Sequence, residues 1–104
     1  MQTAFLAETT LGYAQSAAVD ASTLISSLTF QGQAVAGIPA GTVLLLLMPQ
    51  TQAIRWRDDG TAPSATVGYP LAVGTELRYT GTNMGALRVI SQVAGAIVNV
   101  IAYK

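Results

Sequence analysis

Two stretches of this chain carry apolar side chains on consecutive residues, TVLLLLMP at residues 42–49 and AIVNVIAY at residues 96–103. A membrane-spanning helix needs about 20 apolar residues, so neither stretch is long enough to cross a bilayer as a helix. Short apolar runs of this kind are typical of strands that are covered on both faces. We therefore predict that both stretches form central β-strands.

Glycine and proline divide the rest of the chain into short segments. From Gly32 to the C-terminus, no interval between these residues is long enough for a helix of ordinary length. Alternating apolar and polar residues predict strands at residues 53–57, 76–80 and 87–92, and a weaker strand at residues 26–30. We predict an all-β fold, a small antiparallel β-sandwich of jelly-roll type.

The N-terminal third is ambiguous. Residues 14–28 are rich in alanine and serine, and both a helix and an extended arm fit this composition. We predict a β-sandwich domain at residues 23–104 and, at residues 1–22, an extended or partly helical arm that lies on a neighbouring subunit. At the other end of the chain, Gly95 and Ala96 are predicted to form the hairpin turn between the last two strands.

The composition argues against several kinds of chemistry. The chain of 104 residues has no cysteine and no histidine, which removes disulfides, thiolate and imidazole nucleophile systems, and the common zinc ligands. Five acidic and five basic residues balance, so net charge attracts the chain neither to nucleic acid nor to membranes. We expect no enzyme, no catalytic residues, no cofactor, no metal, and neither a nucleic-acid nor a membrane partner.

The low content of charge points to assembly. Charged residues make up 10% of the chain, whereas soluble domains average about 25%. Threonine, serine, glutamine, alanine and glycine take the place of charge on the surface. Together with the two doubly apolar stretches, this predicts that other subunits cover much of the surface. We expect a trimer or a larger assembly of copies.

The most distinctive motif is RWRDDGTAP at residues 55–63, where a strand ends and a turn begins. Within the strand, alternation places Trp56 on the same side as Ile54, and these two residues are predicted to be the buried structural anchor. The N-terminal residues lack the basic start and the long apolar stretch of a signal peptide, so we also expect synthesis in the cytoplasm.

Five charged residues are candidate interface residues. Arg55 and Arg57 share the face opposite the anchor, and Asp58 and Asp59 follow them directly, while Arg78 lies on a later predicted strand. Three interpretations stay open for this motif: local ion pairs that cap the strand, an arginine-lined subunit interface, or a site for carbohydrate, phosphate or nucleic acid. Adjacent carboxylates on a strand diverge, and no further acidic residues follow at calcium-loop spacing, so a metal site is not predicted.

The C-terminal part of the chain has a recognisable order of motifs, from residue 40 to residue 104. After the leucine-rich stretch come AIRWRDDGTAPSATVG, ELRYTG, LRVI and GAIVNVIAY. This order resembles small virion structural proteins of tailed bacteriophages and prophages. No catalytic or ligand-binding residues come with the resemblance.

The resemblance implies a structural component of a tailed-phage virion, assembled in the cytoplasm of the bacterial host. A many-copy capsid decoration (cement) protein ranks first, with the major capsid protein, other virion proteins and copies of itself as partners. The alternative is a neck, collar, tail or fibre subunit. A further alternative is a β module that binds carbohydrate or a host surface, with Tyr69, Tyr79 or Tyr103 as stacking residues. Single tyrosines on strands and next to turns more often form the rim of a core, and this interpretation ranks above stacking.

Overall fold

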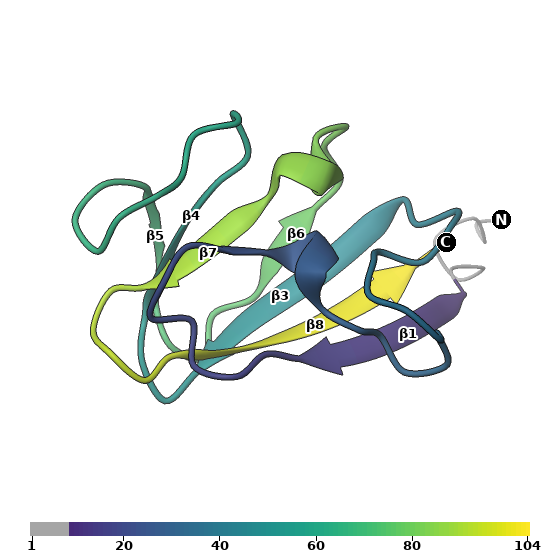
Figure 1. The fold of residues 1–104 in the computed structure, drawn as a ribbon, viewed down its shortest axis with the longest axis horizontal. Helices are drawn as coiled ribbons and strands as arrows, with labels where there is room; N and C mark the ends of the chain where they lie inside the picture. Colours follow the sequence, from purple (N-terminus) through teal and green to yellow (C-terminus); the bar gives the residue numbers. More distant parts are fainter. Residues whose placement is uncertain (1–8) are drawn as a thin grey trace, which may run out of the picture.

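The computed structural model describes residues 9–104 as two antiparallel sheets of four strands each, packed face to face (Figure 1). The predicted all-β sandwich is confirmed. Two short 3-10 helices in the described residues are η2 (Ile25–Ser27) and η3 (Met84–Ala86). The strands are β1 (Thr10–Gln15), β2 (Thr23–Leu24), β3 (Leu44–Gln50), β4 (Ile54–Arg57), β5 (Tyr69–Leu71), β6 (Leu77–Tyr79), β7 (Arg88–Ser91) and β8 (Ile97–Tyr103).

The strand order is that of a jelly roll. Sheet A has the order β1-β8-β3-β6 and sheet B the order β2-β7-β4-β5. First and last strands pair, then second and seventh, third and sixth, and fourth and fifth. A long antiparallel hairpin that rolls up on itself produces this pairing. The central pairings β3–β8 and β4–β7 then complete sheet A and sheet B.

The five strongest predicted strands are confirmed as β3, β4, β6, β7 and β8, each within two residues of its predicted ends. The weaker prediction at residues 26–30 is wrong. There the chain forms the turn of η2, in which the Leu28 amide donates to the Ile25 carbonyl at 3.1 Å. This turn lets Ile25 and Phe30 both enter the core, where each is fully buried.

The predicted hairpin at Gly95 and Ala96 is also wrong, because β7 and β8 belong to different sheets. The turn instead carries the chain from one sheet to the other. Asp20 holds it in place: its Oδ1 accepts hydrogen bonds from the Gly95 amide at 2.8 Å and from the Ser91 hydroxyl at 3.0 Å. A carboxylate far away in sequence, rather than a local turn motif, therefore shapes this connection.

The structure differs from the predicted arm at residues 1–22. Its described part lies within the sandwich, because β1 pairs with β8 of the same chain and Val19 is buried in the core. The helix considered for residues 14–28 does not form either. Ser16 shows why the segment stays extended: its hydroxyl accepts a hydrogen bond from the Val98 amide at 2.9 Å, next to the end of β1. The rest of the predicted arm, residues 1–8, lies outside the described residues.

The core fills the space between the two sheets. Ile54 on β4 is fully buried, as expected for the anchor, whereas Trp56 is only partly buried and packs against the rim of the core. The described residues include no helix with the length and hydrophobicity needed to cross a membrane. The buried apolar residues are Ala14, Val19, Ile25, Phe30, Leu44, Leu45, Leu47, Ile54, Leu71, Tyr79, Leu87, Val89, Ala96, Val98, Val100 and Ala102.

Candidate functional site

The outer face of sheet A is apolar at its centre. On β3, Leu45 and Leu47 point into the core and are fully buried, so the alternate residues Leu46 and Met48 point outward. Ile101 on β8 lies directly beside Leu46 in the register of the sheet. The two apolar stretches of the sequence thus place apolar side chains on both faces of sheet A, one turned to the core and one turned away from it.

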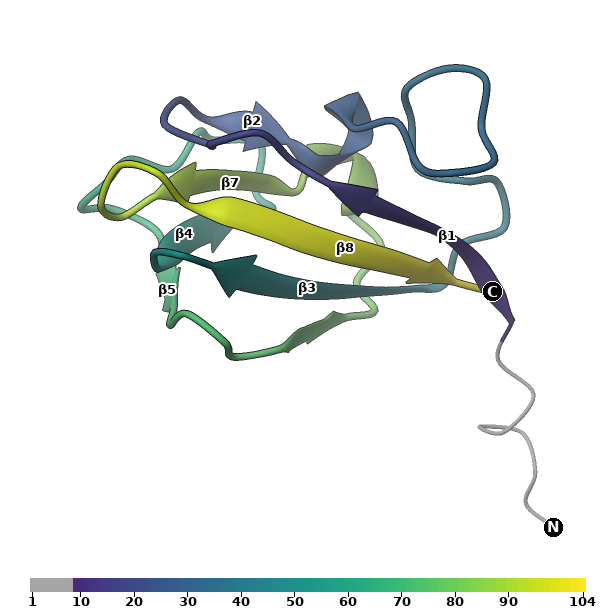
Figure 2. The same ribbon diagram turned by 90° about the horizontal axis from the view of Figure 1, so that it is seen from below.

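Tyr13 on β1 extends this surface, because it pairs with Ile101 on the neighbouring strand. Figure 2 looks onto β8 and β3, and no other described segment lies over them. We call the outward side chains Tyr13, Leu46, Met48 and Ile101 the apolar face. A shallow hollow of about 290 Å³ is present there, and Glu76 contributes to its wall.

One end of this surface is polar but uncharged. The Tyr13 hydroxyl donates to Asn99 Oδ1, and Asn99 Nδ2 donates to Gln50 Oε1 at 2.7 Å. Gln15 Nε2 donates to the same oxygen at 3.2 Å. The network holds these side chains together across β1, β8 and β3.

The predicted interface arginines Arg55 and Arg57 bind within their own chain. Arg55 donates from Nε to the Ala65 carbonyl at 3.1 Å and from Nη1 to the Gly68 carbonyl at 2.8 Å, so it secures the β4–β5 loop. Arg57 forms a two-pronged ion pair with Asp59, with 3.0 Å between Nε and Oδ1. The local interpretation of the motif therefore accounts for both residues.

Asp58 and Asp59 point to different partners, as expected for neighbouring residues. Hydrogen bonds from Arg57 and from the Thr61 amide lower the pKa of Asp59 to about 2. Asp58 Oδ2 instead accepts a hydrogen bond of 2.6 Å from the Tyr79 hydroxyl. Burial of Tyr79, reinforced by this bond, raises its pKa to about 12. Within residues 9–104, no cluster of three acidic side chains could hold a metal ion.

Three aromatic rings lie together, because Trp56 on β4 contacts both Tyr69 on β5 and Tyr79 on β6. The Trp56 ring lies 5.5 Å from the Tyr69 ring, tilted by 39°, and 6.2 Å from the Tyr79 ring, edge to face. Tyr79 is buried, but Tyr69 is 68% exposed. We call Trp56, Tyr69 and Tyr79 the aromatic edge. A hollow of about 370 Å³ lies beside it, lined by Trp56, Arg57, Asp58, Asp59, Gly68 and Tyr69.

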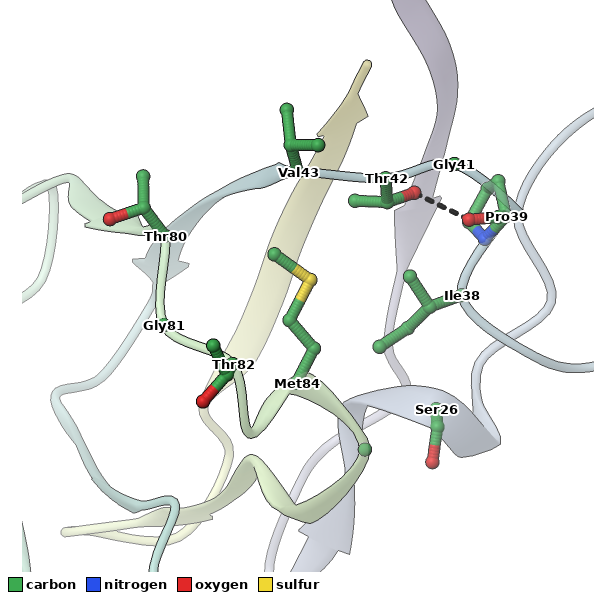
Figure 3. Close-up of a pocket in the computed structure, with 11 residues that line it drawn as sticks. Ser26, Ile38, Pro39, Gly41, Thr42, Val43, Thr80, Gly81, Thr82 and Met84 are labelled. Atoms are coloured by element: carbon green, nitrogen blue, oxygen red, sulfur yellow. Dashed lines mark hydrogen bonds between the residues drawn. The ribbon is translucent and has the colours of Figure 1, made fainter.

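A larger open pocket, of about 610 Å³, lies at one end of the sandwich (Figure 3). Ile38 and Met84 contribute apolar side chains, and the Thr42 hydroxyl is already bound to the Pro39 carbonyl at 2.6 Å. No charged side chain lines it. This pocket therefore offers serine and threonine hydroxyls but no acidic or basic side chain that would activate them. Its lining residues are Ser26, Ile38, Pro39, Gly41, Thr42, Val43, Thr80, Gly81, Thr82, Met84 and Gly85.

Two features of these surfaces escaped the sequence analysis. Arg88 on β7 lies directly opposite Arg57 in sheet B, and its buried Nε has no hydrogen-bond partner among the described residues. Alternation within residues 87–92 could have placed Arg88 outward, but its position beside Arg57 depends on strand order. The exposure of Tyr69 depends in the same way on its pairing with Trp56. Arg78, the remaining candidate, is exposed on β6 next to Leu46.

Comparison with protein-family models, with curated proteins and with solved structures finds no match for this chain. The function is therefore argued from the surfaces described above.

Proposed function

We propose that this chain is a structural subunit of a tailed-bacteriophage virion, and specifically a many-copy capsid decoration protein. The observation that carries the proposal is the apolar face of sheet A, over which no other described segment lies: Met48 is exposed, and Tyr13, Leu46 and Ile101 are half-buried. A charge content of only 10% is consistent with a surface that neighbouring subunits occupy. The protein acts by binding, and the proposal assigns no catalytic residue.

The topology and the resemblance of residues 40–104 support the same proposal. Jelly rolls are a recurrent fold of viral capsid domains, although they also occur in lectins and cupins. A fold hosts many functions, so the topology adds weight only together with the apolar face. The resemblance to small virion proteins supplies the setting, a phage particle assembled in the host cytoplasm.

The energetics favour repeated contacts. Each 100 Å² of apolar surface removed from water contributes about 2.5 kcal/mol. Association costs about 4–15 kcal/mol in lost freedom, so one small contact binds weakly. On a shell, many copies occupy equivalent positions, and each copy contacts the shell and its neighbouring subunits. The free energies of these contacts add up. Arg78 on β6 and Glu76, directly before this strand, carry opposite charges at the rim, which can set the register against a neighbouring subunit.

The test uses particles that lack this protein. The purified chain is mixed with them, and the bound fraction is measured after sedimentation. We expect the wild type to bind in many copies, and Ile101→Lys to lose binding because it places a charge in the centre of the apolar face. Val93→Lys is the matched control, since Val93 is 59% exposed in the turn between β7 and β8.

Three outcomes are informative. Binding of the wild type and of Val93→Lys, with loss in Ile101→Lys, supports the proposal. A chain that stays monomeric and never associates with capsid, neck or tail contradicts it. Association in only a few copies per particle contradicts the decoration role and favours the neck, collar, tail or fibre alternative.

A further inference from the structure

The aromatic edge has features that the assembly proposal does not use. We propose that the hollow beside it binds a neutral saccharide: Tyr69 stacks against a pyranose ring, and Arg57, Asp58 and Asp59 bind its hydroxyl groups. This inference stands independently of the virion proposal, because it concerns a different surface of the isolated chain.

The stacking platform is Tyr69. Its ring is 68% exposed and is supported from one side by Trp56, 5.5 Å away, which lies opposite it on β4. Trp56 is in turn held by the buried Tyr79. An aromatic ring fixed from behind and open in front loses little freedom when a flat apolar surface covers it. The C–H face of a pyranose is such a surface.

Hydrogen-bonding groups surround the platform. The pairing with Asp59 fixes the orientation of Arg57, whose Nη1 makes no hydrogen bond within the described part of the chain. Asp58 uses only Oδ2 to accept from Tyr79. Its Oδ1 is therefore available as an acceptor beside an available guanidinium donor. Of two neighbouring sugar hydroxyls, one can donate to the Asp58 carboxylate and the other can accept from the Arg57 guanidinium.

The charge of the hollow favours a neutral ligand. One arginine and two aspartates line it, which gives a net charge of −1. Arg88, opposite Arg57 in the sheet, brings the local balance to zero, so phosphate groups, and with them nucleic acid, meet no net positive charge here. Its volume of about 370 Å³ falls at the lower end of the range for small-molecule sites, roughly 300–1,000 Å³. These properties fit a short, uncharged oligosaccharide.

The loop that carries the aspartates is already ordered by its own contacts. Arg55 binds the carbonyls of Ala65 and Gly68, and the Ser64 hydroxyl accepts a hydrogen bond from the Val67 amide at 3.0 Å. A loop that is held at several points loses little conformational entropy when a ligand binds. The hollow is thus preformed in the free chain.

The experiment exploits the single tryptophan of the chain, which lies in the proposed site. The full chain is titrated with neutral trisaccharides of glucose, galactose, mannose and N-acetylglucosamine, while Trp56 emission and amide chemical shifts are recorded. We expect one of them to bind with a dissociation constant near the millimolar range, with shifts concentrated in residues 56–69. Tyr69→Ala should weaken binding by about tenfold or more, equivalent to about 1.4 kcal/mol.

The matched variants keep the test falsifiable. Tyr69→Phe retains the ring and should bind like the wild type, whereas Tyr103→Phe, on the outer face of sheet A, should change nothing. Should Tyr69→Ala fail to fold, Asp58→Asn replaces it, and it should also weaken binding. The proposal is overturned when no trisaccharide changes emission or shifts, when Tyr69→Ala or its replacement Asp58→Asn binds as tightly as the wild type, or when inorganic phosphate binds more tightly than the sugars. No particle is present, so a failure here leaves the assembly proposal intact.

Discussion

Removing the hydroxyl of Tyr79 isolates the contact that joins the core to the β4–β5 loop. Tyr79 is only 5% exposed, and its hydroxyl donates to Asp58 at 2.6 Å. Hydrogen bonds to charged groups contribute about 1.5–3 kcal/mol to stability. Because water reaches part of Asp58, we expect Tyr79→Phe to cost about 1–2 kcal/mol at neutral pH. For a domain of this size, that lowers the melting temperature by roughly 5–15 °C.

The same residue predicts how stability depends on alkaline pH. An unfolded tyrosine ionises near pH 10, whereas burial and the bond to Asp58 raise the pKa of Tyr79 to about 12. Above pH 10 the unfolded chain releases a proton that the folded chain still holds, so the free energy of unfolding falls as pH rises. The contribution of Tyr79 is complete below pH 10 and is lost by about pH 12, and it amounts to about 3 kcal/mol.

Chemical denaturation followed by Trp56 emission, at neutral pH and in steps from pH 9 to pH 12, measures both effects. Tyr69→Phe is the control, because it removes an exposed hydroxyl that makes no hydrogen bond within residues 9–104. In Tyr79→Phe the alkaline loss should be shallower than in the wild type. Equal stability at pH 7 together with an unchanged alkaline slope would refute this account of the contact.

Two further predictions concern the core and the ion pair. Leu47→Ala, in the fully buried centre of β3, should cost about 2–5 kcal/mol in calorimetry or denaturant titration; a cost below 1 kcal/mol would show that the sheets do not pack as described. Arg57→Gln should reduce stability in acid. In the wild type, Arg57 holds the pKa of Asp59 at about 2, so the ionised Asp59 stabilises the fold above about pH 4. This stabilisation is lost as the pH falls toward 2. Acid titration of the melting temperature checks it, and an identical acid profile in both proteins would contradict it.

Much of the fold could be predicted from local pattern. The apolar stretches at residues 42–49 and 96–103 became β3 and β8, and alternation located β4, β6 and β7. Strands with a side-chain period of two carry this signal in their own residues. β1 was missed because Gly12 interrupts its alternation, next to a shift in the register with β8. There the small residue allows close approach: a Cβ at Gly12 would lie 3.2 Å from that of Phe30.

The candidate surfaces could be predicted only in part. The stretch at residues 42–49 predicted apolar side chains on both faces of a strand, but it did not say which of them face outward. Which side chains become their neighbours depends on strand order. Arg55 was a candidate interface residue with a local role left open, and the structure places its donors on carbonyls of the β4–β5 loop. A loop conformation that comes from contacts between residues 55 and 68 leaves no periodic trace in the sequence. The exposure of Tyr69 follows from its place on the edge strand β5, which is known only once both sheets are assembled.

The two proposed surfaces can act together because they lie on different sides of the sandwich. The apolar face is the outer side of sheet A, whereas Trp56 and Tyr69 lie on β4 and β5 of sheet B. A subunit docked through the first surface leaves the second available. Weak sugar binding by one copy then becomes strong when many copies on one particle engage a glycan-bearing surface at once, since linked binding events raise the effective concentration. A millimolar site on a single chain is, for that reason, consistent with tight adhesion of an assembled particle.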